Sequence, residues 1–325
     1  MTELQQKRIN NLKITKEKRK SQLCRVFELK INYKSLNKKE QQELNFIFVQ
    51  AKRVINDMIT ISKTESIFKY NYKNHRIVKV RYPDKHLEDK EITLPTAIHQ
   101  DICQSKMLDI KNLSKAKKKG RKIGKLKYKK EINTIPIRTG MIRLNSKNKN
   151  KLTFPGFKNI RVNGTNQFIK LKNYEIANAN LLRKATGFYI HLTVFLPKTK
   201  KEKINKSIGI DMGIKTAIVT SEGNIYNAKI KESEHLKKLQ KKLSRKKQDS
   251  NNFRKIKKAI QKEYEYLTNK KNDLANKVVS ELKKYDTIYF QDEQLSNWKK
   301  RKRIKKSSKR KKTRIWKSNS ILYFR

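Results

Sequence analysis

The sequence has almost none of the features of a secreted, disulfide-bonded or membrane-spanning protein. Its two cysteines, Cys24 and Cys103, exclude a disulfide framework and a zinc site built from CxxC pairs. No apolar run approaches the roughly 18–20 residues that a membrane span needs, and residues 1–20 contain no signal-peptide-like apolar stretch. We therefore expect a cytoplasmic protein without membrane contacts. Cys24, beside Val26 in a predicted strand, is expected to be a small core residue.

Acidic residues are scarce, whereas basic residues are abundant. The 325 residues include 84 Lys and Arg but only 28 Asp and Glu, which gives a formal net charge of +56. A chain with this much like charge repels itself unless a polyanion neutralises it. Without a membrane segment, nucleic acid is the predicted partner. The length predicts about two domains, each with a buried core.

Two segments concentrate the basic charge and contain no acid. Residues 111–130 hold eleven Lys or Arg, interleaved with Tyr128, and residues 299–314 hold twelve. The first segment predicts a nucleic-acid-binding loop, with a solvated loop as the alternative. The second has few apolar residues to bury, so we expect it to be extended or disordered when unbound.

Apolar periodicity predicts a mixed α and β fold. Phe27, Leu29 and Ile31 alternate with polar residues, which indicates a strand at 22–33. The other predicted elements, in chain order, are helices at 38–62 and 95–113, a loop around Gly120 and Gly124, a β-rich region at 131–197 whose clearest strand is 188–196, a strand at 207–213, a hairpin at 216–226, helical stretches at 236–243 and 253–282, and a strand at 286–290.

Carboxylates follow two of the predicted strands in the C-terminal half. Asp211 ends the first strand between Gly209 and Gly213, and Asp292 and Glu293 follow the strand at 286–290. Hairpin strands, helices and a return strand with acids at strand ends suggest an RNase H-like layered domain. There, Mg²⁺ ions held by hard carboxylate oxygens clamp a phosphodiester. A turn-capping Asp and a solvated strand end are the alternatives.

Several stretches resemble the TnpB/OrfB family, the transposon-encoded RNA-guided endonucleases related to type V CRISPR effectors. SIGIDMGIKTAIVTSEGNIY resembles the family's first RuvC motif, and residues 235–293 resemble the helical insertion that leads to the second. LLRKATGFYIHLTVFLP resembles the strand pair before the nuclease domain, and GRKIGKLKYKK resembles the preceding basic segment. The resemblance covers roughly residues 115–298, and the stretch around KKLSRKK is its most specific part.

The resemblance implies an α+β fold, with an oligonucleotide-binding-like β-barrel, an inserted helical lobe and an incomplete RNase H-like (RuvC) domain with a helical hairpin insertion. The implied domains are an N-terminal arm and first barrel strand at 1–35, a helical recognition lobe ending in a basic loop at 36–125, the rest of the barrel at 126–200, a partial RuvC-like domain at 204–298 and a basic tail at 299–325.

The resemblance also implies site residues and partners. Asp211 corresponds to the first catalytic carboxylate and Mg²⁺ ligand, and Glu293 to the second, with Asp292 as the alternative. The implied partners are a guide RNA from the transposon end and double-stranded target DNA, bound by one protein monomer at the nucleoid of a prokaryotic cell. The implied nucleic-acid-binding residues are Lys117, Lys118, Lys119, Arg121, Lys122, Lys125, Lys127, Tyr128, Lys129, Lys130, Arg245, Lys246 and Lys247.

The sequence departs from the family after Glu293. Family members continue with a zinc ribbon and a third RuvC acid, whereas here no acid follows Glu293 and no cysteine follows Cys103. We therefore expect no zinc, a truncated chain and defective cleavage. The segment WKSNSILYF, read one base later, can be back-translated to a family-like strand, which favours a frameshift after Trp298. An active Mg²⁺-dependent endonuclease completed by another acid or chain, and a generic basic RNA-binding protein, are the alternatives.

Overall fold

The computed structural model describes residues 2–82, 84, 86–124, 126–138, 140–145, 150–164, 171, 174–198, 205–213, 218–226, 230 and 233–290. The chain divides into two compact units, Met1–Thr199 and Lys200–Arg325. None of the helices within the described ranges combines the length and apolar character needed to cross a bilayer.

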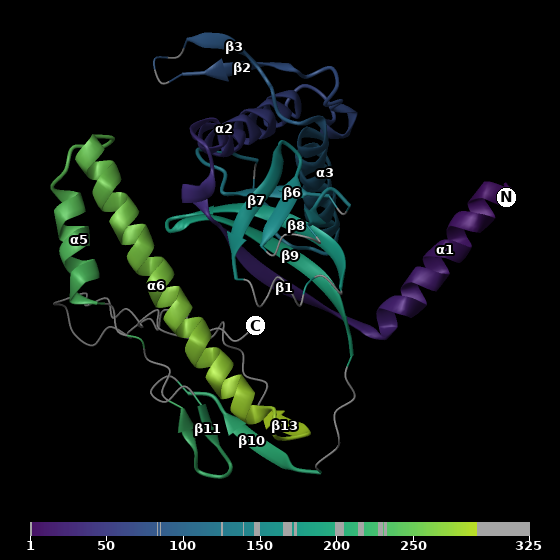
Figure 1. Cartoon of the computed structure of the whole chain (residues 1–325), viewed down its shortest axis with the longest axis vertical. Helices are drawn as coiled ribbons and strands as arrows, with labels where there is room; N and C mark the ends of the chain where they lie inside the picture. Colours follow the sequence, from purple (N-terminus) through teal and green to yellow (C-terminus); the bar gives the residue numbers. More distant parts are fainter. Residues whose placement is uncertain are drawn as a thin grey trace, which may run out of the picture. The chain divides into compact units, whose positions relative to one another are not determined.

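The first unit combines three long helices with strands of very different lengths (Figure 1). Its helices are α1 (Glu3–Lys20), α2 (Lys38–Ile61) and α3 (Thr96–Lys118), with short 3-10 turns at Tyr33–Ser35 and Ile67–Lys69. Its strands are β1 (Gln22–Ile31), β2 (Ile77–Arg81), β3 (Leu87–Glu91), β4 (Thr134–Ile137), β5 (Arg143–Leu144), β6 (Lys151–Phe154), β7 (Phe157–Asn163), β8 (Glu175–Lys184) and β9 (Gly187–Pro197).

A seven-stranded antiparallel sheet forms the centre of the first unit. Its strand order is β4-β8-β9-β1-β7-β6-β5, whereas β2 and β3 form a separate hairpin. β1 lies in the middle, and its Leu29 pairs with Ile190 of β9. Both side chains are fully buried. The predicted strands at 22–33 and 188–196 are therefore confirmed.

The helices α2 and α3, together with the β2–β3 hairpin, come between β1 and β4 in the chain. α2 begins with a capping box between Asn37 and Glu40. Its predicted apolar stripe is buried and joins the same core as the sheet residues. The α2 residues buried in this way include Leu44, Ile47, Phe48, Ala51, Val54, Ile55 and Met58.

The second unit contains a smaller sheet and two helices. Its elements are β10 (Ser207–Asp211), β11 (Ile218–Thr220), β12 (Ile225–Tyr226), α5 (Glu234–Ser244), α6 (Asn251–Leu282) and β13 (Thr287–Phe290). The strand order is β12-β11-β10-β13. β10 is antiparallel to β11 and parallel to β13. The buried core of this unit consists of Ile208, Ile218, Val278 and Leu282, so α6 packs on the sheet through its last turns.

Three local predictions need amendment. α1 was not predicted, because none of its residues is buried and it therefore has no apolar stripe to detect. α3 continues past the predicted end at 113 to Lys118. The core position predicted for Cys24 is wrong, because Cys24 is exposed. In a strand with Leu29 and Ile31 inside, an even-numbered residue points to the opposite face.

Candidate nucleic-acid interface

The basic segment begins where a glycine ends α3. Gly120 has φ +76°, the left-handed conformation that favours glycine. The Gly120 N–H donates to the Lys117 carbonyl at 2.9 Å, and the Arg121 N–H donates to the Ala116 carbonyl at 3.1 Å. This pair of bonds is a Schellman motif, which satisfies the last helical carbonyls and turns the chain away from the helix axis. Lys117 and Lys118 therefore lie in the last helical turn, and the segment continues beyond Gly120 outside the helix.

Asn56, a half-buried residue of α2, holds the basic segment at Lys129. Its side-chain amide donates to the Lys129 carbonyl at 3.1 Å, and its oxygen accepts from the Lys129 N–H at 2.7 Å. An amide that satisfies both backbone groups of one residue acts as a substitute strand partner. The main chain of the basic segment is thus held against α2, while its side chains stay free to bind.

Tyr128 provides a second attachment of this segment to α2. The Lys63 ammonium lies 4.5 Å from the centroid of the Tyr128 ring and donates to its hydroxyl at 2.7 Å. Thr60 Oγ1 lies 3.3 Å from the same hydroxyl. The hydrogen bonds with Lys63 and Thr60 lower the pKa of the Tyr128 phenol. Half of the Tyr128 side chain remains exposed, so one face of the ring is available for stacking on a base.

The predicted cations of the segment all face solvent, with the exception of Lys125, which is outside the described residues. Within the described part of the chain, they form no ion pair with an acid. Their charge is therefore available to a polyanion. The cations described in this way are Lys117, Lys118, Lys119, Arg121, Lys122, Lys127, Lys129 and Lys130.

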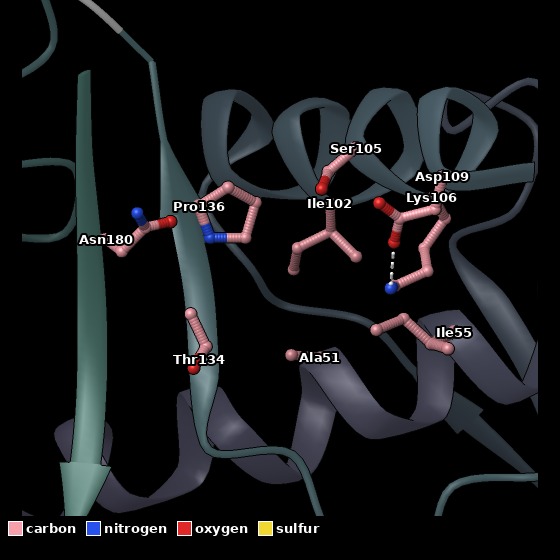
Figure 2. Close-up of a pocket in the computed structure, with 9 residues that line it drawn as sticks. All are labelled: Ala51, Ile55, Ile102, Ser105, Lys106, Asp109, Thr134, Pro136 and Asn180. Atoms are coloured by element: carbon pink, nitrogen blue, oxygen red, sulfur yellow. Dashed lines mark hydrogen bonds and ion pairs between the residues drawn. The ribbon is translucent and has the colours of Figure 1, made fainter. Parts of the chain in front are cut away.

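A cavity of about 230 Å³ lies beside this anchored segment, between α2, α3 and the strands β4 and β8. Figure 2 shows an apolar floor from both helices and a polar rim that includes the ion pair of Lys106 and Asp109. That pair spans 2.6 Å. Ile55, which lines the cavity, directly precedes Asn56. The other lining residues are Ala51, Ile102, Ser105, Thr134, Pro136 and Asn180.

Asp211 is the last residue of β10 in the second unit, and it is exposed. It pairs with Val219 of β11. Two residues earlier, the Gly209 N–H donates to Ser221 Oγ at 3.1 Å, and the Ser221 N–H donates to the Gly209 carbonyl at 2.9 Å. A Cβ at Gly209 would lie 3.5 Å from the Ser221 Cβ, an ordinary contact. The hairpin turn thus fixes the strand that carries Asp211.

Two tyrosine–glutamate pairs hold α6 and the following turn to this hairpin. The Tyr226 hydroxyl donates to Glu281 of α6, which raises the pKa of Tyr226 to about 12. The Tyr285 hydroxyl donates to Glu222 in the hairpin turn at 2.5 Å. The first bond joins β12 to the end of α6, and the second joins residues from opposite sides of the α5–α6 insertion.

The second pair of predicted acids follows β13. β13 runs parallel to β10, with Ile210 opposite Phe290. Asp292 and Glu293 come two and three residues after Phe290, and they lie outside the described residues. In the part of the chain that the structure describes, no three His, Cys, Asp or Glu side chains gather closely enough to hold a metal ion.

The structure does not bring Arg245, Lys246 and Lys247 near Asp211. These exposed cations lie in the turn between α5 and α6. At about 1.5 Å per residue, the start of α6 lies about 40 Å along the helix from Val278, where α6 meets the sheet. Any nucleic acid that contacts both the turn and Asp211 must therefore be long.

Sequence reasoning missed the residues that position the basic segment. Asn56 and Thr60 lie on the polar side of α2, and Lys63 lies in the turn that follows it, where an exposed side chain is the ordinary case. Their roles depend on contacts with residues more than sixty positions away. No local pattern in the sequence indicates such contacts.

Comparison with known proteins gives one family match and one structural likeness. Residues 190–289 match the model of the OrfB_IS605 family, described as a probable transposase. No curated protein matches the chain. A cryo-EM structure of a Cas12f1–sgRNA–target DNA complex is similar with a TM-score of 0.42 and 13% sequence identity, covering 83% of this chain and 81% of that chain.

Proposed function

We propose that the chain is a transposon-associated, RNA-guided DNA-binding protein of the TnpB/OrfB family, because residues 190–289 match the model of the OrfB_IS605 family. It holds a guide RNA and a duplex DNA target, and base pairing between the two reads the sequence. The observation that carries this proposal is the family match over 190–289, the region that includes β10 to β13 and both helices between them. The net charge of +56 supports a polyanionic partner.

The topology supports the two domains that the resemblance implies. In the second unit, the order β12-β11-β10-β13, with β13 parallel to β10, is consistent with the first four strands of an RNase H-like (RuvC) domain. In the first unit, helices inserted between β1 and β4 of an antiparallel sheet are consistent with a barrel that carries a helical lobe. We propose that the lobe and its basic segment grip nucleic-acid backbone.

Asp211 suits one position in a Mg²⁺ site, because its carboxylate is exposed at a strand end and offers hard oxygen ligands. When bound, Mg²⁺ stabilises the charge that develops on a reacting phosphodiester. Glu293, or Asp292 in its place, would hold the ion from the other strand. The described residues supply one carboxylate, which does not complete a site. In this proposal Asp211 would bind and orient the ion.

We further propose that these 325 residues bind DNA without cutting it. They contain Asp211 and the Asp292–Glu293 pair, but no acid after Glu293. The test is incubation of the purified chain and its RNA with duplex DNA and Mg²⁺, alongside Asp211→Ala. If the parent chain cuts DNA and the variant does not, an active endonuclease completed by another acid or chain is the better description.

The proposal as a whole is tested by sequencing the RNA that co-purifies with the chain after a high-salt wash, expressed with its native flanking DNA. We expect one dominant structured transcript from the transposon end, bound to a single protein monomer at the nucleoid. A broad mixture of cellular RNA contradicts the proposal and favours a generic basic RNA-binding protein. A variant tests the role of the basic segment. The triple replacement Lys127→Gln, Lys129→Gln and Lys130→Gln should retain less RNA than the parent chain.

A further inference from the structure

The helix α1 is unlike the other long helices of the first unit, because none of its residues is buried. Only Ile9 and Arg19 are even partly covered. An isolated helix of this length is marginal in water, since most helical stability in proteins comes from packing of an apolar face. α1 has no such packing within the described residues. A partner that covers it would stabilise it.

The last turn of α1 is firmly attached to the sheet. The Arg19 guanidinium bonds to the Glu175 carboxylate at 2.5 Å and 3.1 Å, and its carbon lies 3.4 Å from the centroid of the Phe195 ring. Lys18 bonds to the same carboxylate at 2.9 Å. The Lys198 ammonium donates to the Lys20 carbonyl at 2.7 Å. The helix is thus fixed at one end, at β8 and β9, and uncovered along the rest.

The charge of α1 is strongly positive. Its sequence holds five Lys and two Arg against two Glu, a net charge of +5 from seven cations minus two acids. Besides the cations of the attached turn, Lys7, Arg8, Lys13 and Lys16 form no ion pair within the described residues. These four cations are available to an anionic partner.

The four free cations lie on different sides of the helix. At about 100° per residue, Arg8, Lys16 and Lys13 lie roughly 100°, 180° and 240° around the axis from Lys7. A membrane surface or a protein groove contacts one side of a helix and requires an apolar stripe there. The exposed apolar residues of α1, Leu4, Leu12 and Ile14, lie roughly 60°, 140° and 340° around the axis from Lys7, so Lys7 and Arg8 interrupt them and they form no continuous stripe.

Cations around a helix match phosphates on more than one side, which is what the groove of a nucleic-acid duplex provides. The major groove of B-form DNA admits an α-helix, whereas the major groove of A-form RNA is too deep and narrow for side chains to read. We propose that α1 is an arm that lies in the major groove of duplex DNA and grips both phosphate backbones. This inference rests on the proposed function, in which duplex DNA is a partner.

The role of the arm is to position and retain DNA, because contacts with phosphate oxygens carry no sequence information. The rigid attachment through Arg19 and Glu175 fixes the direction in which the arm leaves the sheet. Lys7 lies about 18 Å along the helix from Arg19, at 1.5 Å per residue. The arm therefore extends more than three helical turns beyond its attachment to β8 and β9, without adding to the core.

The test is the salt dependence of duplex DNA binding by the full chain with its co-purified RNA. The variant replaces Lys7, Arg8, Lys13 and Lys16 with Gln. Each phosphate contact contributes about 0.9 to the slope of log K against log salt, so we expect the slope to become shallower by about 2 to 4. Relative to 1 M salt, where the two proteins should bind alike, this slope change corresponds to an affinity loss of about 100- to 10,000-fold at 0.1 M salt.

The matched control replaces the exposed apolar residues of the same helix, as Leu4→Gln, Leu12→Gln and Ile14→Gln. We expect this control to leave DNA affinity unchanged, and circular dichroism should show that both variants keep the parent fold. An unchanged slope in the charge variant overturns the inference, as does a loss confined to duplex RNA or a loss caused by the apolar variant. If the parent protein binds no duplex DNA, the proposed function itself fails.

Discussion

Asp101, in the first half of α3, accepts two hydrogen bonds from Arg138, directly after β4. One comes from the Arg138 backbone N–H at 2.7 Å and the other from its guanidinium Nε at 2.9 Å. Asp101 is buried, with 7% of its surface exposed, whereas the Arg138 side chain is 38% exposed. The carboxylate thus replaces its lost water contacts with two donors from a single residue. This pairing joins α3 to the sheet.

Replacing Asp101 with Ala should destabilise the first unit by about 2–4 kcal/mol, because the Arg138 backbone N–H and guanidinium Nε both lose their acceptor, and the guanidinium keeps only its bond to Gln104. Chemical denaturation of the full chain measures the loss. Asp109→Asn is the control on the same helix, since its exposed pair with Lys106 should contribute at most about 1 kcal/mol. Equal losses from the two variants would contradict this account.

Replacing Asn56 with Ala should release the basic segment from α2. Both hydrogen bonds to the Lys129 backbone disappear, so hydrogen exchange at the Lys129 amide should become faster. Affinity for RNA should fall by about two- to tenfold, because a mobile segment must be ordered on binding. Asn45→Ala, on the same helix but remote from the segment in sequence, should change neither quantity.

Acid should destabilise the first unit through His99. The side chain is fully buried, and neither ring nitrogen has a hydrogen-bond partner among the residues that the structure describes. Burial, together with nearby Arg76 and His75, lowers the pKa of His99 to about 4. The unfolded chain takes up the proton at its ordinary value near 6.5, so stability is complete above that pH and falls as the pH drops toward 4.

The loss over this range should be of the order of 3 kcal/mol, from about 1.4 kcal/mol per unit of pKa. Denaturation at pH 7 and pH 4.5 measures the difference. His99→Leu should flatten the profile between these values, whereas His86→Gln, at an exposed site beside Asp84, should leave it unchanged. A parent protein that is equally stable at both pH values would refute this assignment.

Shortening a buried side chain between α6 and the small sheet should destabilise the second unit, including the strand that carries Asp211. Leu282→Ala removes one of the four buried apolar residues that join α6 to the small sheet and should cost about 2–4 kcal/mol. Hydrogen exchange in β10 and β11 should become faster. Val279→Ala, on the same helix but 42% exposed, is the matched control and should cost well under 1 kcal/mol.

Elements with a regular apolar period could be predicted from the sequence. The α2 stripe, the alternation in β9 and the hairpin around Glu222 all place apolar residues at the spacing that their structure requires. α1 could not be found in this way, because a helix that buries nothing leaves no periodic signal. The end of α3 depends on Gly120, whose backbone conformation stops the helix five residues beyond its last predicted turn.

For the candidate site, the sequence could predict the types of residue involved but not how the fold positions them. Basic charge near Tyr128 and an acid at Asp211 are visible in the sequence as residue types. Their placement depends on long-range contacts, such as Asn56 with Lys129 and Ser221 with Gly209, which hydrogen bonding creates only in the folded chain. The partnership of Asp211 with Asp292 or Glu293 stays a prediction.

The parallel pairing of β10 with β13 also affects how the protein is made. Ser207 pairs with Thr287, so the strand neighbours are separated by eighty residues of chain. At about 5–20 residues per second, the ribosome needs about 4–16 s to synthesise that interval. During this time β10 presents an unpaired edge, which is the form of sheet most open to wrong pairing with another chain. The rate of translation through α5 and α6 therefore sets how long each nascent molecule is exposed to misassembly.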